Sequence, residues 1–300
     1  MAPPWKISAE EELEKNPKLK REDLMEIKRW IKEQPHLALT PIEDEIILHF
    51  LHATFYNVEA AKKTLDYFYY YKVTMPDFFS GWDPLQPDIQ EMINEVLIAA
   101  PLPIPNNEGL RMIICKLDDN SKKFNYPLCV KWLLMTSMHA IWKLGIQPGF
   151  ILVYDAAGFS LSHCFKCSLS QAKNYIDFGK NAAPMRVVKV VFINTSPVVE
   201  KMLTLVKPFL NKDLINMMSF HSKPDTFFKD LPKENVPEDY GGTLAPLSSL
   251  HRKYVEEVTE NRDWLMKEEK IKCDKSKRGS PKKEKQKEKV ESSLKGLEID

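Results

Sequence analysis

The first part of the chain shows the hydrophobic spacing of amphipathic helices. Apolar side chains recur every three or four residues between positions 8 and 80, and Leu24, Ile27 and Ile31 are the first to share one helix face. Thr40 followed by Pro41 is typical of a helix start and predicts a second helix there. The apolar faces of the second and third expected helices comprise Ile46, Ile47, Phe50, Leu51, Ala61, Leu65, Phe68 and Tyr69. Short connections between such helices predict a small antiparallel bundle.

Beyond residue 88 the pattern changes to an alternation of strands and helices. We expect helices over 89–100, 126–145, 168–182, 197–210 and 247–272, and strands over 109–117, 150–155 and 187–194. Strands that alternate with helices favour βαβ units and a largely parallel sheet. The sequence therefore predicts an α/β fold class, with an N-terminal helical bundle followed by an α/β domain with a mostly parallel sheet.

The stretch VVKVVFINTSPVVEKMLTLVKPFL at 187–210 is unusually apolar. In its strand only Lys189 is charged, which predicts burial on both faces, with Val188, Val190 and Phe192 sharing one of them. In the following helix, which Ser196 can cap, the polar residues Glu200, Lys201, Thr204 and Lys207 form one narrow stripe. The rest of this helix needs an apolar partner in addition to the sheet. That partner is either more protein or a lipid in a cavity, with the helix as its lid and Pro208 as a stop or hinge.

Composition and charge narrow the class of protein. Of the 300 residues 43% are hydrophobic, which is enough for a sizeable core. The last 34 residues carry a net charge of +4 and the preceding 266 a net charge of −3, a distribution that does not favour nucleic-acid binding. We expect the tail from about residue 275 to be disordered. The N-terminus lacks the apolar core of a signal peptide, no apolar run is long enough to span a membrane, and five cysteines fit reduced intracellular thiols. These features predict a cytoplasmic protein.

No catalytic or metal-binding constellation is visible in the sequence. His163, Cys164 and Cys167 resemble half of a zinc site, but no second Cys/His pair lies at ligand spacing, so we expect no metal and interpret the cysteines as small hydrophobic residues. Asp155 ends an expected parallel strand, a place where catalytic acids do occur, and we interpret it as structural. Phosphate-binding loops and nucleophile elbows are lacking, so we expect no enzyme activity and no cofactor.

Four segments together resemble one family. They are EDEIILHFLHATFYNVEAAKKTL, FILVYDAAGFSLSH, APMRVVKVVFINTSPVVEKMLTLVKPFLNK and ENVPEDYGG, and they extend over roughly residues 20–245. The strand that ends in Asn194, the KPFL at 207–210 and the Asp-Tyr-Gly-Gly at 239–242 are specific in combination. The chain is similar to the CRAL-TRIO lipid-binding family, which includes alpha-tocopherol transfer protein and cellular retinaldehyde-binding protein. The resemblance implies an N-terminal bundle at 1–88, a lipid-binding domain at 89–250 with a mobile lid helix at about 197–210, and a C-terminal helix and tail at 251–300.

Position and family pattern together give candidate ligand-binding residues: Cys129, Leu133, Thr136, Tyr154, Tyr175, Phe178, Val190, Phe192, Met202, Leu203 and Val206. The remaining lid candidates are Val198, Val199, Leu205, Phe209 and Leu210. Core packing is the alternative role for each of these side chains. A cavity of this kind is mostly apolar, with a few polar groups that orient the ligand, and Thr136, Tyr154 and Cys129 are the polar candidates.

The sequence departs from the family at its basic residues. Members that bind phosphoinositides have arginines where this chain has His49 and His52, which we interpret as solvated surface residues with a pH-sensitive contact as the alternative. Candidate contacts to anionic lipid are Arg186, Lys189 and Lys212, which are few for attraction to a charged bilayer.

The sequence thus predicts a monomeric, non-enzymatic carrier for one hydrophobic small molecule of the retinoid, tocopherol-like or carotenoid type. Its partners would be that lipid and, transiently, a membrane surface, and not nucleic acid. Two alternatives remain open: a phosphatidylinositol or phospholipid exchange protein, and a scaffold module that transfers nothing.

Overall fold

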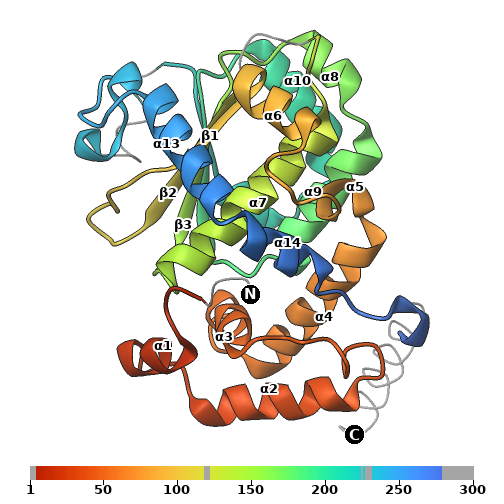
Figure 1. Cartoon of the computed structure of the whole chain (residues 1–300). Coiled ribbons are helices and arrows are strands. Elements are labelled where there is room, and N and C mark those ends of the chain that lie inside the picture. Colours follow the sequence, from red (N-terminus) through yellow and green to blue (C-terminus); the bar gives the residue numbers. More distant parts are fainter. Residues whose placement is uncertain (1–4, 118–121, 224–225, 227–231, 279–300) are drawn as a thin grey trace, which may run out of the picture.

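The computed structural model describes residues 5–117, 122–223, 226 and 232–278 (Figure 1). The N-terminal part contains α1 (Ala9–Lys15), α2 (Arg21–Glu33), α3 (Asp44–Ala53), α4 (Val58–Thr74), α5 (Pro76–Phe79) and α6 (Pro87–Glu95). The central part contains β1 (Leu97–Pro101), β2 (Arg111–Leu117), α7 (Tyr126–Leu144), β3 (Phe150–Asp155), α8 (Leu161–Lys166), α9 (Leu169–Asn181) and β4 (Val187–Ile193). It continues with α10 (Pro197–Val206), the 3₁₀ helix η1 (Lys207–Phe209), α11 (Lys212–Met217) and β5 (Met218–His221). The 3₁₀ helices η2 (Lys233–Asn235) and η3 (Glu238–Tyr240) lead to α13 (Leu247–Glu260), α14 (Arg262–Lys270) and η4 (Lys275–Lys277).

The N-terminal helices pack as the hydrophobic pattern predicted. Leu24, Ile27 and Ile31 of α2 are buried, and so are the eight residues expected to face the core from α3 and α4. The predicted start of α3 at Pro41 was wrong, because this helix begins at Asp44 with Glu43 at the N-cap. The Thr40 hydroxyl instead donates a hydrogen bond to the Lys272 carbonyl oxygen at 3.2 Å. Thr40 therefore ties the bundle to the C-terminal segment and does not cap a helix.

A five-stranded sheet with the order β1-β2-β3-β4-β5 forms the centre of the second part. β2, β3, β4 and β5 are parallel, and β1 is antiparallel to β2. The predicted helix over 89–100 was therefore half wrong, because it ends at Glu95 and residues 97–101 form an edge strand. A short apolar run such as LIAAP has no period that separates helix from strand. The edge strand β5 was not predicted at all.

β4 does not have the symmetric burial that its sequence predicted. A bulge shifts the register so that Phe150 pairs with Val187 while Ile151 pairs with Lys189. Because of this shift, Val187 lines a cavity together with Val190 and Phe192, and Val188 does not. Because Val191 and Ile193 on the opposite face are buried while Val190 and Phe192 are only half-buried, one face of β4 packs against protein and the other faces open space.

A hydrogen-bond network joins the carboxyl ends of β3 and β4. Asp155 accepts hydrogen bonds from the Asn194 amide at 2.9 Å and from the Tyr240 hydroxyl at 2.8 Å. Gly242 follows Tyr240 at a position where a Cβ atom would lie 1.9 Å from the Val236 carbonyl oxygen, so only glycine fits. These contacts support the interpretation of Asp155 as structural.

The C-terminal segment returns to the N-terminal bundle (Figure 1). Lys72 of α4 and Glu268 of α14 form a buried ion pair at 2.7 Å, and Arg278 pairs with Asp66. The expected disorder from residue 275 was therefore wrong for residues 275–278, and its remainder lies outside the described residues. Within the described ranges, no helix has both the length and the apolar character needed to cross a bilayer.

Candidate functional site

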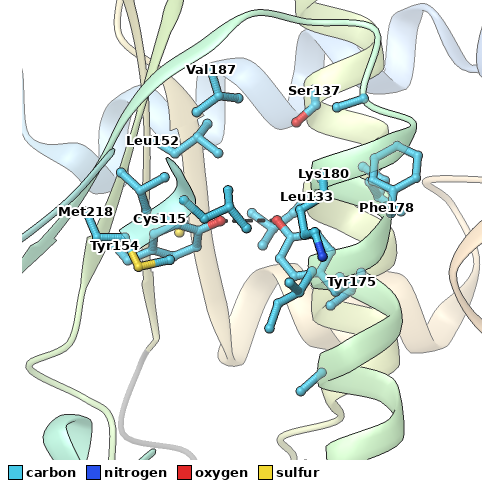
Figure 2. Close-up of a pocket in the computed structure, with 18 of the residues that line it drawn as sticks. Cys115, Leu133, Ser137, Leu152, Tyr154, Tyr175, Phe178, Lys180, Val187 and Met218 are labelled. Carbon is cyan, nitrogen blue, oxygen red and sulfur yellow. Dashed lines mark hydrogen bonds between the residues drawn. The ribbon is translucent and has the colours of Figure 1, made fainter. Parts of the chain in front are cut away.

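A cavity of about 700 Å³ lies between the sheet and helices α7, α9, α10 and α11. Its walls are mostly apolar, and Figure 2 shows side chains from the strands facing side chains from the helices across it. Pockets that hold a small molecule have this size and composition, with a few polar groups in an apolar wall.

Most of the predicted ligand-binding residues line this cavity. They are Cys129, Leu133, Tyr154, Tyr175, Phe178, Val190, Phe192, Met202, Leu203 and Val206. Thr136 does not, and its placement was wrong. The lining residues of α7 form one helix face that includes the adjacent pairs Cys129 and Val130, Leu133 and Leu134, and Ser137 and Met138. Thr136 lies just outside this face and is fully buried in the protein core. The α7 residues with a hydroxyl that do line the cavity are Tyr126 and Ser137.

Sequence reasoning missed several lining residues on the strands. Cys115 on β2 and Phe220 on β5 line the cavity in the same row as Tyr154 and Phe192, because the four residues are neighbours in register across the sheet. Met218, Leu152 and Val187 also line it. Alternation along β3 from Tyr154 could have found Leu152, and the β2–β3 register could have found Cys115. Val187, Met218 and Phe220 depend on the bulge in β4 and on β5, and neither was predicted.

An aromatic row forms part of the cavity floor. The rings of Tyr154 and Phe192 are stacked with centroids 5.3 Å apart, and those of Phe192 and Phe220 with centroids 4.9 Å apart. Stacked aromatic side chains pack rigidly against one another, so the Tyr154 ring is held in place from one side.

The predicted lid helix is α10 with η1. Val199 and Leu210 line the cavity beside Met202, Leu203 and Val206. Val198, Leu205 and Phe209 do not, and Leu205 is 53% exposed. The α-helix ends at Val206, and the chain continues through Pro208 as a 3₁₀ turn, because proline has no N–H for the helical hydrogen bond. The segment thus has one apolar face over the cavity and further apolar side chains outside.

The polar groups that line the cavity include the charged side chains of Lys116, Asp155, Lys180, Arg186 and Asp213 and a pair of uncharged hydroxyls. The hydroxyls of Tyr154 and Tyr175 lie 3.1 Å apart. Burial raises the pKa of Tyr154 well above its usual value, that of Tyr175 to about 12 and that of the Cys129 thiol to about 12. These groups therefore stay protonated near neutral pH. Within the described residues no three His, Cys, Asp or Glu side chains are placed to hold a metal ion.

The interpretation of His49 and His52 as surface residues was wrong. Their exposed fractions are only 4% and 5%. Burial lowers the pKa of His49 to about 3, and burial together with the nearby Arg186 guanidinium lowers that of His52 to about 4. Both side chains are neutral at physiological pH. They lie on the buried face of α3 and not on the solvent-exposed surface.

Arg186 is held at the rim of the cavity. Its guanidinium donates a hydrogen bond to the His52 carbonyl oxygen and lies 4.2 Å from the centre of the Phe55 ring. Of the three candidate contacts to anionic lipid, Arg186 and Lys189 are half-buried, and only Lys212 is exposed. Phe55, Gly179, Lys180, Asn211 and Asp213 are lining residues that are also exposed, so they mark where the cavity meets solvent.

Comparisons with known proteins agree with this architecture. Residues 98–242 match the family model described as CRAL/TRIO domain, and residues 16–89 match the one described as Pinta-like, UBA domain. The mouse protein "Alpha-tocopherol transfer protein-like" is 25% identical over 80% of this chain and 70% of its own length. Mouse "Clavesin-1" is 25% identical over 78% of this chain and 67% of its own length. The crystal structure of Sfh5 has the same fold, with a TM-score of 0.53 at 11% identity, over 83% of this chain and 98% of that one.

Proposed function

Residues 98–242 form a CRAL/TRIO domain, the domain of a lipid-binding and lipid-transfer family, and on that premise we propose that this chain is a non-enzymatic carrier of one hydrophobic small molecule. The ligand class we favour is retinoid, tocopherol-like or carotenoid. The observation that supports it best is the cavity of about 700 Å³ with mostly apolar walls.

The wall chemistry supports binding by burial of apolar surface. Removal of apolar surface from water stabilises a complex by about 25 cal/mol per Å², so a long apolar ligand needs few polar contacts. A phospholipid would bring a charged head group. Tyr154, Tyr175 and Cys115 are uncharged, and the charged residue that Figure 2 labels with them, Lys180, is exposed and pairs with Asp177. A neutral lipid therefore fits the cavity better than a phospholipid.

We further propose that α10 acts as the lid and that exchange takes place at a membrane. Leu205 on α10 and Leu161 and Phe165 on α8 are 53%, 48% and 87% exposed. Figure 1 shows both helices at the end of the molecule away from α1 and α2. Exposed lysines at 201, 207 and 212 accompany this apolar surface, a combination that suits the interface of a bilayer. The proposed place of action is the cytoplasm.

A transfer assay tests this function. Donor vesicles that contain a fluorescent retinoid or tocopherol analogue are mixed with acceptor vesicles and with the full chain. We expect transfer at a rate that rises with protein concentration, because each molecule carries one ligand. A rate that equals spontaneous exchange at every protein concentration would overturn the carrier function.

A further inference from the structure

The tyrosine hydroxyl pair lies where a ligand in the cavity would meet it. Tyr154 extends from β3 and Tyr175 from α9, and their hydroxyl oxygens are 3.1 Å apart. Figure 2 shows the two hydroxyls joined across the cavity, with Cys115 and Leu133 beside them. The stack of Tyr154 on Phe192 fixes the ring from the sheet side, so this polar site is largely preformed.

Hydrogen-bond accounting shows what this pair lacks. Each phenol has one proton to donate, and the contact between the two hydroxyls uses only one of them. The second O–H faces an apolar cavity, where an unused donor is unfavourable. An oxygen atom of a ligand would accept that proton, and a ligand hydroxyl could in turn donate to one of the phenol oxygens.

The charged residues near the cavity decide whether the ligand oxygen at this pair can carry a negative charge. The Arg186 guanidinium already donates a hydrogen bond to the His52 carbonyl oxygen, and the Asp155 carboxylate already accepts hydrogen bonds from Asn194 and Tyr240. The charged lining residue that Figure 2 labels, Lys180, is exposed, and its ammonium lies 3.8 Å from the Asp177 carboxylate. Burial of an anion without a cation is strongly unfavourable, so a carboxylate or phosphate is disfavoured at this pair.

We propose that Tyr154 and Tyr175 bind the polar end of the ligand and select lipids with one uncharged oxygen, such as an alcohol or a carbonyl compound. The pair would favour these over fatty-acid anions and over pure hydrocarbons. This inference rests on the proposed carrier function, whose ligand it narrows to a chemical class.

The test uses three molecules that differ only at one end: 1-hexadecanol, palmitate and hexadecane. Each is presented to the full chain in phosphatidylcholine vesicles at neutral pH, and the bound amount is measured by mass spectrometry after the vesicles are removed. The double variant Tyr154→Phe/Tyr175→Phe keeps both rings and removes both hydroxyls. The control Tyr67→Phe/Tyr70→Phe makes the same two changes on α4, at residues that do not line the cavity.

For each probe we compare the amount bound by a variant with the amount bound by the native chain. The affinity of the probe for the vesicle is the same in both measurements and does not affect this ratio. We expect loading of 1-hexadecanol to fall about 2- to 12-fold in Tyr154→Phe/Tyr175→Phe, the range of one net hydrogen bond, and to stay unchanged in the control Tyr67→Phe/Tyr70→Phe. Hexadecane should load equally into the native chain and the double variant, and palmitate should load no better into the native chain than into the double variant. Equal loading of 1-hexadecanol into the native chain and the double variant, or a loss of palmitate loading in the double variant as large as that of 1-hexadecanol, would overturn the inference and leave the carrier function standing. Binding of none of the three would overturn the carrier function itself.

Discussion

The Tyr240 hydroxyl donates a 2.8 Å hydrogen bond to Asp155, although 85 residues separate them in the chain. Asp155 ends β3 on the central sheet, and Tyr240 belongs to the Asp-Tyr-Gly-Gly motif after the lid region. Asn194, at the end of β4, donates to the same carboxyl group. The motif therefore stabilises the carboxyl edge of the sheet beneath the cavity.

Two substitutions that remove hydrogen bonds of this network should lower the free energy of unfolding by different amounts. Tyr240→Phe loses one hydrogen bond and should cost about 1 kcal/mol of unfolding free energy. Asp155→Ala removes the acceptor of three hydrogen bonds, from Tyr240, Asn194 and the Ala157 N–H, and should cost about 3 kcal/mol, as measured by urea denaturation. The control Asp263→Ala changes an exposed acid and should stay within about 0.5 kcal/mol of the native chain. Equal stability of Asp155→Ala and the control would contradict a structural role.

Variants at Gly179 test whether the cavity opens to solvent beside this residue. It lies on α9, is exposed, lines the cavity, and a Cβ there meets nothing within 4 Å. Gly179→Ala should therefore raise the unfolding free energy by about 0.4–1 kcal/mol without an effect on ligand uptake. Gly179→Trp should slow uptake of a fluorescent retinoid in stopped-flow measurements, because the indole would narrow the opening. Uptake at the native rate in Gly179→Trp would place the entrance elsewhere.

Acid should weaken the fold through His52. Its pKa is lowered from about 6.5 in the unfolded chain to about 4 in the folded one. Between these values only the unfolded chain binds the proton, so stability falls as the pH drops from 6.5 to 4, by on the order of 3 kcal/mol at the lower end. His52→Phe should flatten the pH dependence of urea unfolding in this window. An unchanged slope in that variant would show that other groups cause the acid sensitivity.

The exposed apolar side chains of α8 and α10 should matter for transfer but not for binding. Phe165→Glu and Leu205→Glu each place a charge where the proposed membrane contact needs an apolar group. Each should lower the vesicle-to-vesicle transfer rate about tenfold, because burial of one such side chain stabilises contact by about 1.5–3 kcal/mol. Leu39→Glu is the matched control, since Leu39 is 89% exposed and precedes α3 in the bundle. An equal loss in all three variants would indicate a nonspecific effect of charge.

The hydrophobic pattern predicted β3 and β4 closely because their apolar runs are continuous and end in turn signals. It could not separate the run at 97–101 from a helix, because that run is short and has no period. The cavity residues on helices were found through helical spacing, and Thr136 was misplaced because it lies just outside the lining face of α7, whose borders helical spacing alone does not fix. Val187 was missed because it faces the cavity only through a bulge, and such a register shift leaves no mark in a single sequence.

The central claim is that the cavity holds one neutral hydrophobic molecule. Mass spectrometry on an organic extract of the purified chain, after exposure to a mixed lipid extract, tests it most directly. The expected result is a retinoid, tocopherol or carotenoid in a one-to-one ratio to protein. Phospholipid in that ratio, or no lipid bound to protein shown to be folded, would contradict it.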